Sequence, residues 1–178
     1  MNDVVTLPPQ AAGELDRRTY IGGSDIAAIM GLSPWMTPLQ CYERKVNPEP
    51  EILTDEKRKF FARRKRQEPV IAEMLFDTYG IEVTRLSLDE DQNRYIDADI
   101  PFLAAEIDFE FRMSEAIRIA FPDRPQVCGI ADGVLCNGEI KTVHPFKAKE
   151  WGEEGSEDVP IHYAAQGMHG QGATRTRP

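Results

Sequence analysis

The sequence has no apolar run that approaches the ~18 residues of a membrane-spanning helix. Its start, Met1-Asn2-Asp3, has neither the basic residues nor the apolar stretch of a signal peptide. Its three cysteines, Cys41, Cys128 and Cys136, form no CxxC pair and have no histidines at zinc-finger spacing. These absences exclude a zinc finger and predict a cytoplasmic protein with reduced thiols.

Positive charge is outnumbered by negative charge, since 21 Lys and Arg against 30 Asp and Glu give a formal net charge of −9. A deficit of Lys and Arg argues against a nucleic-acid partner, because contacts to phosphates require cationic side chains. The basic residues are nevertheless concentrated, because seven of the ten positions from 57 to 66 are Lys57, Arg58, Lys59, Arg63, Arg64, Lys65 and Arg66. A duplex responds to the local field and not to the whole-chain sum, so this cluster is equally compatible with a DNA-backbone contact and with a solvated face.

The length of 178 residues and the hydrophobic content of 41% fit one globular domain. We expect a loose lead-in over 1–16, a domain over 17–169 and a polar tail over 170–178. Apolar periodicity and capping residues predict helices over 22–31, 37–45, 54–79 with an interruption at Pro69, 146–151, and from about 160 onward. Alternation predicts strands over 81–86, 94–96, 102–111 and 139–143, with a hairpin over 127–136. This order predicts an α/β fold with a central mixed β-sheet flanked by helices.

The stretch from Gly138 to Thr142 carries a carboxylate and an ammonium two residues apart. In a strand, Glu139 and Lys141 would point to the same face. Mg²⁺ prefers carboxylate oxygens at about 2.1 Å, and a neighbouring Lys suits the positioning of an attacking water. A Glu/Lys pair on a solvated strand is the more ordinary interpretation of the tripeptide alone.

Further acidic residues offer two metal candidates. In the strand predicted over 102–111, Glu106, Asp108 and Glu110 would share one face, where three carboxylates repel unless solvent or a cation separates them. Asp108 is therefore either a metal ligand or part of an exposed acidic face. Asp132 precedes Gly133, and the pair is typical of a hairpin turn.

The first predicted helix opens with Gly22-Gly23-Ser24. Helix N-termini attract anions, so Ser24 is a candidate contact to a DNA phosphate. The segment has no P-loop pattern, however, and a structural turn is the favoured interpretation.

Several segments, in one order, resemble a known family. They are the run from Ile21 to Gly31 with Ser33-Pro34-Trp35, Glu68-Pro69, the run from Phe102 to Asp108, Glu139-Ile140-Lys141-Thr142, and the run from Val159 to Gln166. Together they resemble the YqaJ-type viral recombinases, relatives of phage lambda exonuclease in the PD-(D/E)XK nuclease superfamily. The resemblance covers roughly residues 17 to 169 and implies a restriction-endonuclease-like core.

The resemblance implies a phage or prophage exonuclease that uses Mg²⁺, or Mn²⁺ as a substitute. Such an enzyme resects one strand from the ends of double-stranded DNA with 5′→3′ polarity and passes the remaining strand to a single-strand annealing protein. It also implies a homo-oligomer. By position, Asp108 and Glu139 would be metal ligands, together with the carbonyl of Ile140, and Lys141 would orient the water.

The resemblance implies two further site residues, Glu68 in the helix before the sheet and Gln166 in the last helix. The stretch between Asp108 and Glu139 is longer than the family pattern, which makes Asp132 a competing ligand that we rank below Asp108. The polar, basic end of the chain also departs from the family, and this leads us to expect truncation there. The alternative function is therefore a catalytically inactive DNA-binding module associated with recombination.

Overall fold

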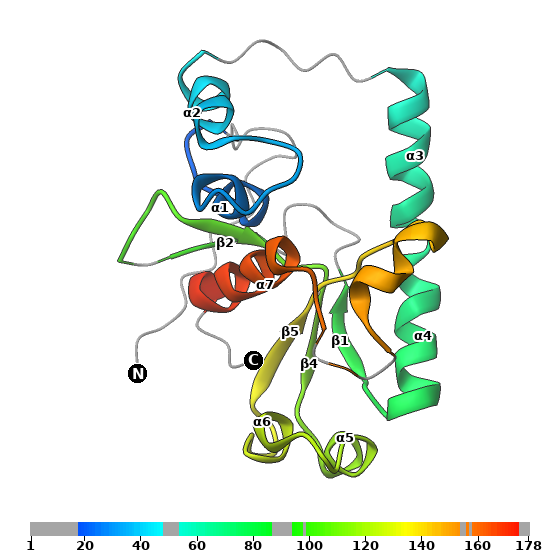
Figure 1. Ribbon diagram of the computed structural model, residues 1–178. Helices are drawn as coiled ribbons and strands as arrows, with labels where there is room; N and C mark the ends of the chain where they lie inside the picture. Colours follow the sequence, from blue (N-terminus) through cyan, green and yellow to red (C-terminus); the bar gives the residue numbers. More distant parts are fainter. Residues whose placement is uncertain are drawn as a thin grey trace.

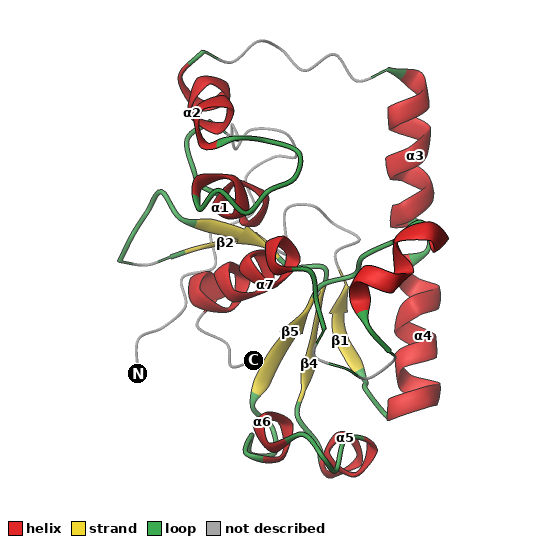
Figure 2. Cartoon of the chain, viewed as in Figure 1, coloured by secondary structure: helices red, strands yellow, loops and turns green. Residues whose placement is uncertain are grey.

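The computed structural model describes residues 18–47, 54–86, 94–97, 99–153, 156 and 158–174. The predicted lead-in over 1–16 lies outside the described residues. Figures 1 and 2 show helices arranged around two small sheets. The helices are α1 (Gly23–Ile29), α2 (Pro38–Val46), α3 (Asp55–Lys65), α4 (Glu68–Tyr79), α5 (Glu115–Ala120), α6 (Pro125–Cys128), the 3-10 helix η1 (Pro145–Trp151) and α7 (Ile161–Thr174). The strands are β1 (Val83–Leu86), β2 (Arg94–Ile96), β3 (Ala104–Glu106), β4 (Phe109–Arg112) and β5 (Leu135–Gly138).

The described strands form two antiparallel sheets, one with the order β1-β4-β5 and one that pairs β2 with β3. A single parallel bridge, Ile21 to Leu103, joins the start of α1 to the smaller sheet. The α/β class is therefore confirmed, but the prediction of one central mixed sheet does not hold for the described part of the chain.

The predicted strand over 102–111 is divided at Ile107 and Asp108, and its two halves belong to different sheets. Ile107 is buried beside α7, where its Cδ1 lies 3.2 Å from the position that a Cβ on Gly170 would take. The expected row of three carboxylates is consequently wrong. Glu106 accepts hydrogen bonds from Tyr20 and Arg94, whereas Glu110 is buried and accepts one from Tyr95.

Two small cores correspond to the two sheets. The larger sheet packs on α5 through a buried cluster of Ile81, Met113, Ile117, Ile130 and Cys136. The smaller sheet packs on α7 through Tyr95, Ala105, Ile107 and Ala173. Because Ile107 and Asp108 are adjacent, the second core holds the backbone from which Asp108 projects.

The helices predicted at the N-terminal side are confirmed. Thr37 caps α2, and its Oγ1 accepts a hydrogen bond from the N–H of Gln40 at 3.2 Å. The long segment predicted over 54–79 is two helices, α3 and α4, with Pro69 in the first turn of α4, where its missing N–H costs nothing. Figure 1 shows the two helices nearly end to end.

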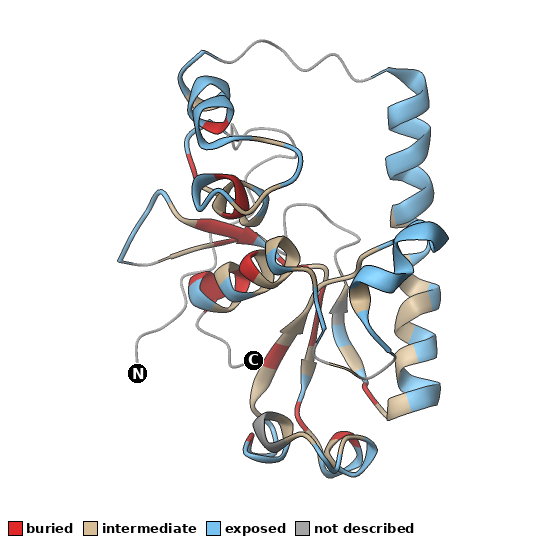
Figure 3. Ribbon diagram, viewed as in Figure 1, coloured by how far each residue is buried: buried red, intermediate tan, exposed pale blue. Residues whose placement is uncertain are grey.

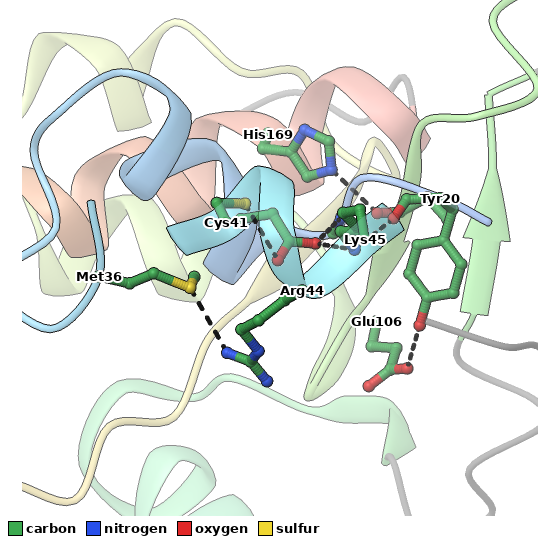
Figure 4. A network of polar contacts seen from close by, with 10 residues as sticks. Tyr20, Met36, Cys41, Arg44, Lys45, Glu106 and His169 are labelled. Carbon is green, nitrogen blue, oxygen red and sulfur yellow. Dashed lines mark hydrogen bonds and ion pairs between the residues drawn. The ribbon is translucent and has the colours of Figure 1, made fainter. Parts of the chain in front are cut away.

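Polar contacts fasten α2 to the start of α1, as Figure 4 shows. The ammonium of Lys45 donates to the carboxylate of Asp25 and to the carbonyl of Tyr20, both at 2.7 Å. The carboxylate of Asp25 also accepts from the N–H of Gly22 at 2.9 Å. These bonds fix the first turn of α1, which packs on α7.

Two predictions in the second half of the chain are wrong. In place of a hairpin over 127–136, the chain forms α6, a turn at Gly133 with φ +77°, and then β5. The final helix does not lose order at Gly170 but continues to Thr174, which is buried and donates to the carbonyl of Gly170 at 2.8 Å. Residues 170–174 therefore belong to α7 and not to the predicted polar tail.

Within the described ranges, no helix has the length and apolarity needed to cross a membrane.

Candidate active site

Asp108 and Glu139 meet because of the register between β4 and β5. Phe109, the first residue of β4, pairs with Gly138, the last residue of β5, so the residues just outside the ladder are neighbours. Asp108 accepts a hydrogen bond from the N–H of Ile140 at 2.7 Å. Gly138 is required there, because a Cβ would lie 2.0 Å from the Phe109 ring.

Glu139 and Lys141 lie just beyond β5 and not in the strand predicted over 139–143, because the strand ends at Gly138. The two side chains nevertheless contact each other, since the ammonium of Lys141 donates to Oε1 of Glu139. Both side chains are about one-fifth exposed. The structure therefore brings the pair together in an irregular loop.

Gln166 reaches the same carboxylate from α7, where its Nε2 donates to Oε1 of Glu139 at 2.5 Å. This approach depends on Gly23 in α1. A Cβ on Gly23 would lie 2.7 Å from Cγ of Gln166, so a larger residue would push the amide aside. The second glycine of the Gly22-Gly23 pair thus makes room for Gln166.

Glu68 is the first residue of α4, and its Oε2 is buried with no hydrogen-bond partner among the described residues. Burial raises the pKa of Glu68, the positive charge of Lys65 lowers it, and the negative charge of Asp108 raises it further. Glu68 is therefore within electrostatic reach of Asp108. An unpaired buried carboxylate oxygen costs free energy unless a cation or a proton satisfies it.

Burial also raises the pKa of the two central carboxylates, Asp108 and Glu139. Burial raises the pKa of Asp108, while the N–H of Ile140 and the charge of Lys141 counteract the rise. Burial, and then the charge of Asp108, raise the pKa of Glu139 to about 7, against the opposing effect of Lys141. Carboxyl groups whose pKa is raised by burial and mutual repulsion are a common signature of a functional site.

These carboxylates are candidates for holding a hard cation. Among the residues that the structure describes, no three Asp, Glu, His or Cys side chains converge into a complete metal site. Mg²⁺ does not need one, because it usually binds through one or two protein carboxylates and keeps several waters. The orphaned oxygen of Glu68 and the raised pKa values of Asp108 and Glu139 both suit an added positive charge.

The basic residues predicted to bind DNA are in α3 or directly after it. Figure 3 shows that this helix is exposed along nearly its whole length, and none of its residues is buried. Lys57 and Arg63 lie in the helix and Arg66 is its C-cap. Lys65 lies near the site, because its charge lowers the pKa of both Glu68 and Asp108.

Arg64 has a different position. Its Nη2 donates to the carbonyl of Thr142 at 3.0 Å, and its guanidinium lies 4.3 Å from the Phe60 ring centroid. Arg64 thus ties α3 to the loop that carries Glu139 and Lys141. A basic run gives no signal for this role, because the partner is a backbone carbonyl distant in sequence.

Two other predicted residues lie outside this group. Ser24 is exposed in the first turn of α1, and α1 has only seven residues. Asp132 is 64% exposed and pairs with Arg118 at 2.7 Å. Asp132 lies before β5, whereas Glu139 lies after it, so a four-residue strand separates the two carboxylates.

One neighbour of the site was not among the predicted residues. Tyr163 lies in α7 one turn before Gln166, and its ring centroid is 5.5 Å from the Lys141 ammonium. The spacing of three residues between Tyr163 and Gln166 indicates a common helix face, but nothing in the sequence indicates that Lys141 lies against this ring.

Comparison with known proteins supports the family assignment. Residues 14–175 match the family model described as the YqaJ-like viral recombinase domain. No curated protein and no solved structure matches the chain. The matched range includes every helix and strand described above, together with Asp108, Glu139, Lys141 and Gln166. The chain therefore belongs to the YqaJ-like viral recombinase family.

Proposed function

We propose that this protein is a Mg²⁺-dependent deoxyribonuclease that resects linear double-stranded DNA from its ends by phosphodiester hydrolysis. One observation carries the proposal: Asp108, Glu139, Lys141 and Gln166, from three separate segments, meet in one partly buried group. The polarity that we propose is 5′→3′, and Mn²⁺ is expected to replace Mg²⁺. Membership of the recombinase family supports a role in DNA recombination.

Asp108 and Glu139 would hold the cation, with the carbonyl of Ile140 as a further ligand and Glu68 contributing directly or through water. A bound Mg²⁺ would neutralise the negative charge that develops on the phosphate oxygens during hydrolysis. The donors fit this ion, because they are all oxygens and Mg²⁺ is a hard cation. Asp132, held by Arg118, has no part in this set.

The chain's own residues would prepare the reaction. Lys141 and Gln166 both donate to Oε1 of Glu139, which fixes the orientation of that carboxylate. Lys141 would also orient the attacking water, because its ammonium stands beside the carboxylates. Preorganised charges of this kind act in the transition state without further rearrangement.

The exposed helix α3 would bind the DNA backbone. Its basic side chains provide local positive charge in a chain whose net charge is −9. Arg64 links this helix to Thr142, directly after Lys141, so a duplex on α3 would lie beside the reacting group. We expect its affinity to fall steeply with salt, since phosphate contacts release counterions.

The remaining parts of the proposal follow from the family. We infer a restriction-endonuclease-like core in which β4 and β5 carry the site and α4 and α7 flank it. We also propose a homo-oligomer that leaves a single strand for an annealing protein, in a phage or prophage setting.

The proposal is tested with a linear duplex labelled at its 5′ ends and a covalently closed circle of the same sequence. We expect release of label from the linear duplex with Mg²⁺, none with EDTA, and no attack on the circle. The Glu139→Ala/Lys141→Ala variant should be inactive, while the control Lys149→Ala, at an exposed position of η1, should remain active. Equal digestion in Mg²⁺ and EDTA, or full activity of the double variant, would refute the proposal.

A second candidate is a DNA-binding module that does not cleave. The observation that favours it is that Oε1 of Glu139 is already occupied by Lys141 and Gln166. Salt-dependent DNA binding without any Mg²⁺-dependent cleavage in the same assay would support this candidate over the first.

A further inference from the structure

Trp35 is a large aromatic residue that is 64% exposed. Hydrogen bonds hold the loop that carries Trp35 in place. The N–H groups of Leu32 and Ser33 donate to the carbonyl of Ala27 at 2.8 and 3.0 Å, which ties the loop to α1. The N–H of Trp35 in turn donates to Oγ of Ser33 at 3.2 Å. The indole is therefore presented to solvent from a fixed turn.

Aromatic contacts support Trp35 from one side. Its ring meets His162 edge-on, with centroids 4.7 Å apart and an interplanar angle of 88°, and lies 5.8 Å from the ring of Tyr163. Trp151 of η1 packs on the same Tyr163 with centroids 5.0 Å apart. Edge-to-face and tilted pairs at these distances are favourable, so the cluster holds Trp35 in one orientation.

This cluster is continuous with the candidate active site. Tyr163 contacts Trp35 and also lies 5.5 Å from the ammonium of Lys141. One turn further along α7, Gln166 donates to Glu139. A single aromatic ring thus stands between the exposed indole and the Glu139–Lys141 pair.

Charged groups also lie around the cluster. Burial lowers the pKa of His162, and nearby Lys147 lowers it while Glu150 raises it. Nη1 of Arg44 lies 3.5 Å from Sδ of Met36, the residue after Trp35 (Figure 4). The Arg44 guanidinium beside the residue that follows the exposed indole suits a ligand that has an aromatic face and a phosphate.

We propose that Trp35 stacks on a nucleobase of the DNA strand whose phosphate lies at Glu139 and Lys141. This inference rests on the proposed function, since it names the part of the substrate that this surface would contact. Every base has a π face, so an exposed indole holds an unpaired base at a strand end whatever the sequence. Continuity with Lys141, through Tyr163, favours a base over a protein partner as the occupant.

The test uses fluorescence, because the chain has two tryptophans, Trp35 and Trp151. In the Trp151→Phe variant Trp35 is the single tryptophan. This variant is titrated in EDTA with a thymidine oligonucleotide and with an abasic oligonucleotide of the same length and charge. We expect the thymidine oligonucleotide to quench Trp35 and the abasic one to leave its emission unchanged. Equal quenching by both, or by neither, would overturn the inference.

Affinity provides the second measurement. Trp35→Ala should weaken binding of the thymidine oligonucleotide roughly tenfold and leave binding of the abasic one unchanged. Trp35→Phe, which keeps a ring, should give an intermediate loss and decides the matter if the alanine variant does not fold. Equal loss for both oligonucleotides contradicts stacking. A change in oligomeric state with no change in either affinity would identify a protein interface and also overturn it.

Because these titrations contain EDTA, they report stacking whether or not the protein cleaves DNA. A protein that stacks bases but never cleaves would refute the proposed nuclease activity alone. A protein that cleaves DNA with base-independent binding would refute the role of Trp35 alone.

Discussion

The two ends of strand β5 carry carboxylates in opposite environments. After the strand, Glu139 is partly buried, its pKa is raised to about 7, and Asp108 is an electrostatic neighbour. Before the strand, Asp132 is largely exposed and paired with Arg118. Glu139 pairs with Lys141 but also has the negative charge of Asp108 nearby, whereas Asp132 is exposed and pairs with Arg118.

Our proposal assigns the reactive role to the Glu139 end and a structural role to the Asp132 end. Burying negative charge beside negative charge is costly, so a cation at the Glu139 end would stabilise the protein under our proposal. An ion pair that solvent reaches adds little to the stability of the fold, and its carboxylate needs no additional cation. The following experiments test this contrast, from the largest expected effect to the smallest.

The largest effect is expected from removing the ammonium at the Glu139 end. Lys141→Met should reduce Mg²⁺-dependent cleavage by about a hundredfold or more, because a preorganised charge beside the reacting phosphate is lost. Lys149→Met, on the exposed surface of η1, serves as the matched control and should stay near wild type. Similar cleavage rates for the two variants would contradict the functional role that we assign to the Glu139 end of β5.

The second effect concerns pH and the stability of the metal-free protein. The folded state raises the pKa of Glu139 from its ordinary value of 4.5 to about 7, so it binds this proton more tightly than the unfolded state does. The resulting stabilisation is present below about pH 4.5 and is lost as the pH rises through 7. We expect a loss on the order of 2 kcal/mol across this window.

Urea unfolding in EDTA at several pH values measures this loss. Glu139→Gln should flatten the pH dependence, while Glu150→Gln, at an exposed position, should leave it unchanged. Parallel curves for wild type and Glu139→Gln would show that Glu139 titrates normally and would remove the electrostatic difference between the two ends of β5.

The third effect tests the support that α1 gives to Gln166. Gly23→Ala should cost about 1–2 kcal/mol and weaken cleavage, because the new Cβ displaces the side chain that holds Glu139. Gly167→Ala, in α7 with open space around the new Cβ, should stabilise by up to about 1 kcal/mol through helix propensity. Thermal unfolding distinguishes them, and equal shifts for the two variants would contradict the proposed contact.

The smallest effect is expected at the Asp132 end. Arg118→Ala removes the partly exposed ion pair with Asp132 and a hydrogen bond to the carbonyl of Ile130. Its cost should be about 1 kcal/mol or less, and cleavage should not change. A large loss of cleavage in this variant would move the functional role toward Asp132.

Much of the site could be predicted from local sequence. The two-residue spacing of Glu139 and Lys141 indicated their contact, although the chain there is a loop and not a strand. Gln166 was placed by resemblance on the last helix, and the structure brings it to Glu139. This contact survives the change from strand to loop because only one residue, Ile140, separates Glu139 from Lys141.

The arrangement of the sheets could not be predicted in the same way. The run from Ala105 to Phe111 alternates between apolar and polar residues, and alternation does not reveal that the chain changes sheets at Asp108. The turn after Gly170 has no apolar period of its own. It is helical because Ala173 packs against the smaller sheet and Thr174 accepts from Asn137. Both features depend on contacts between segments distant in sequence.

The most direct test of the central claim compares Asp108→Asn with Asp132→Asn in the digestion of end-labelled linear duplex. Each substitution removes one negative charge and keeps the size of the side chain. We predict that Asp108→Asn abolishes Mg²⁺-dependent release of label while Asp132→Asn digests DNA at the wild-type rate. Activity retained by Asp108→Asn, or lost in Asp132→Asn, would contradict the assignment of the active site to the Glu139 end of β5.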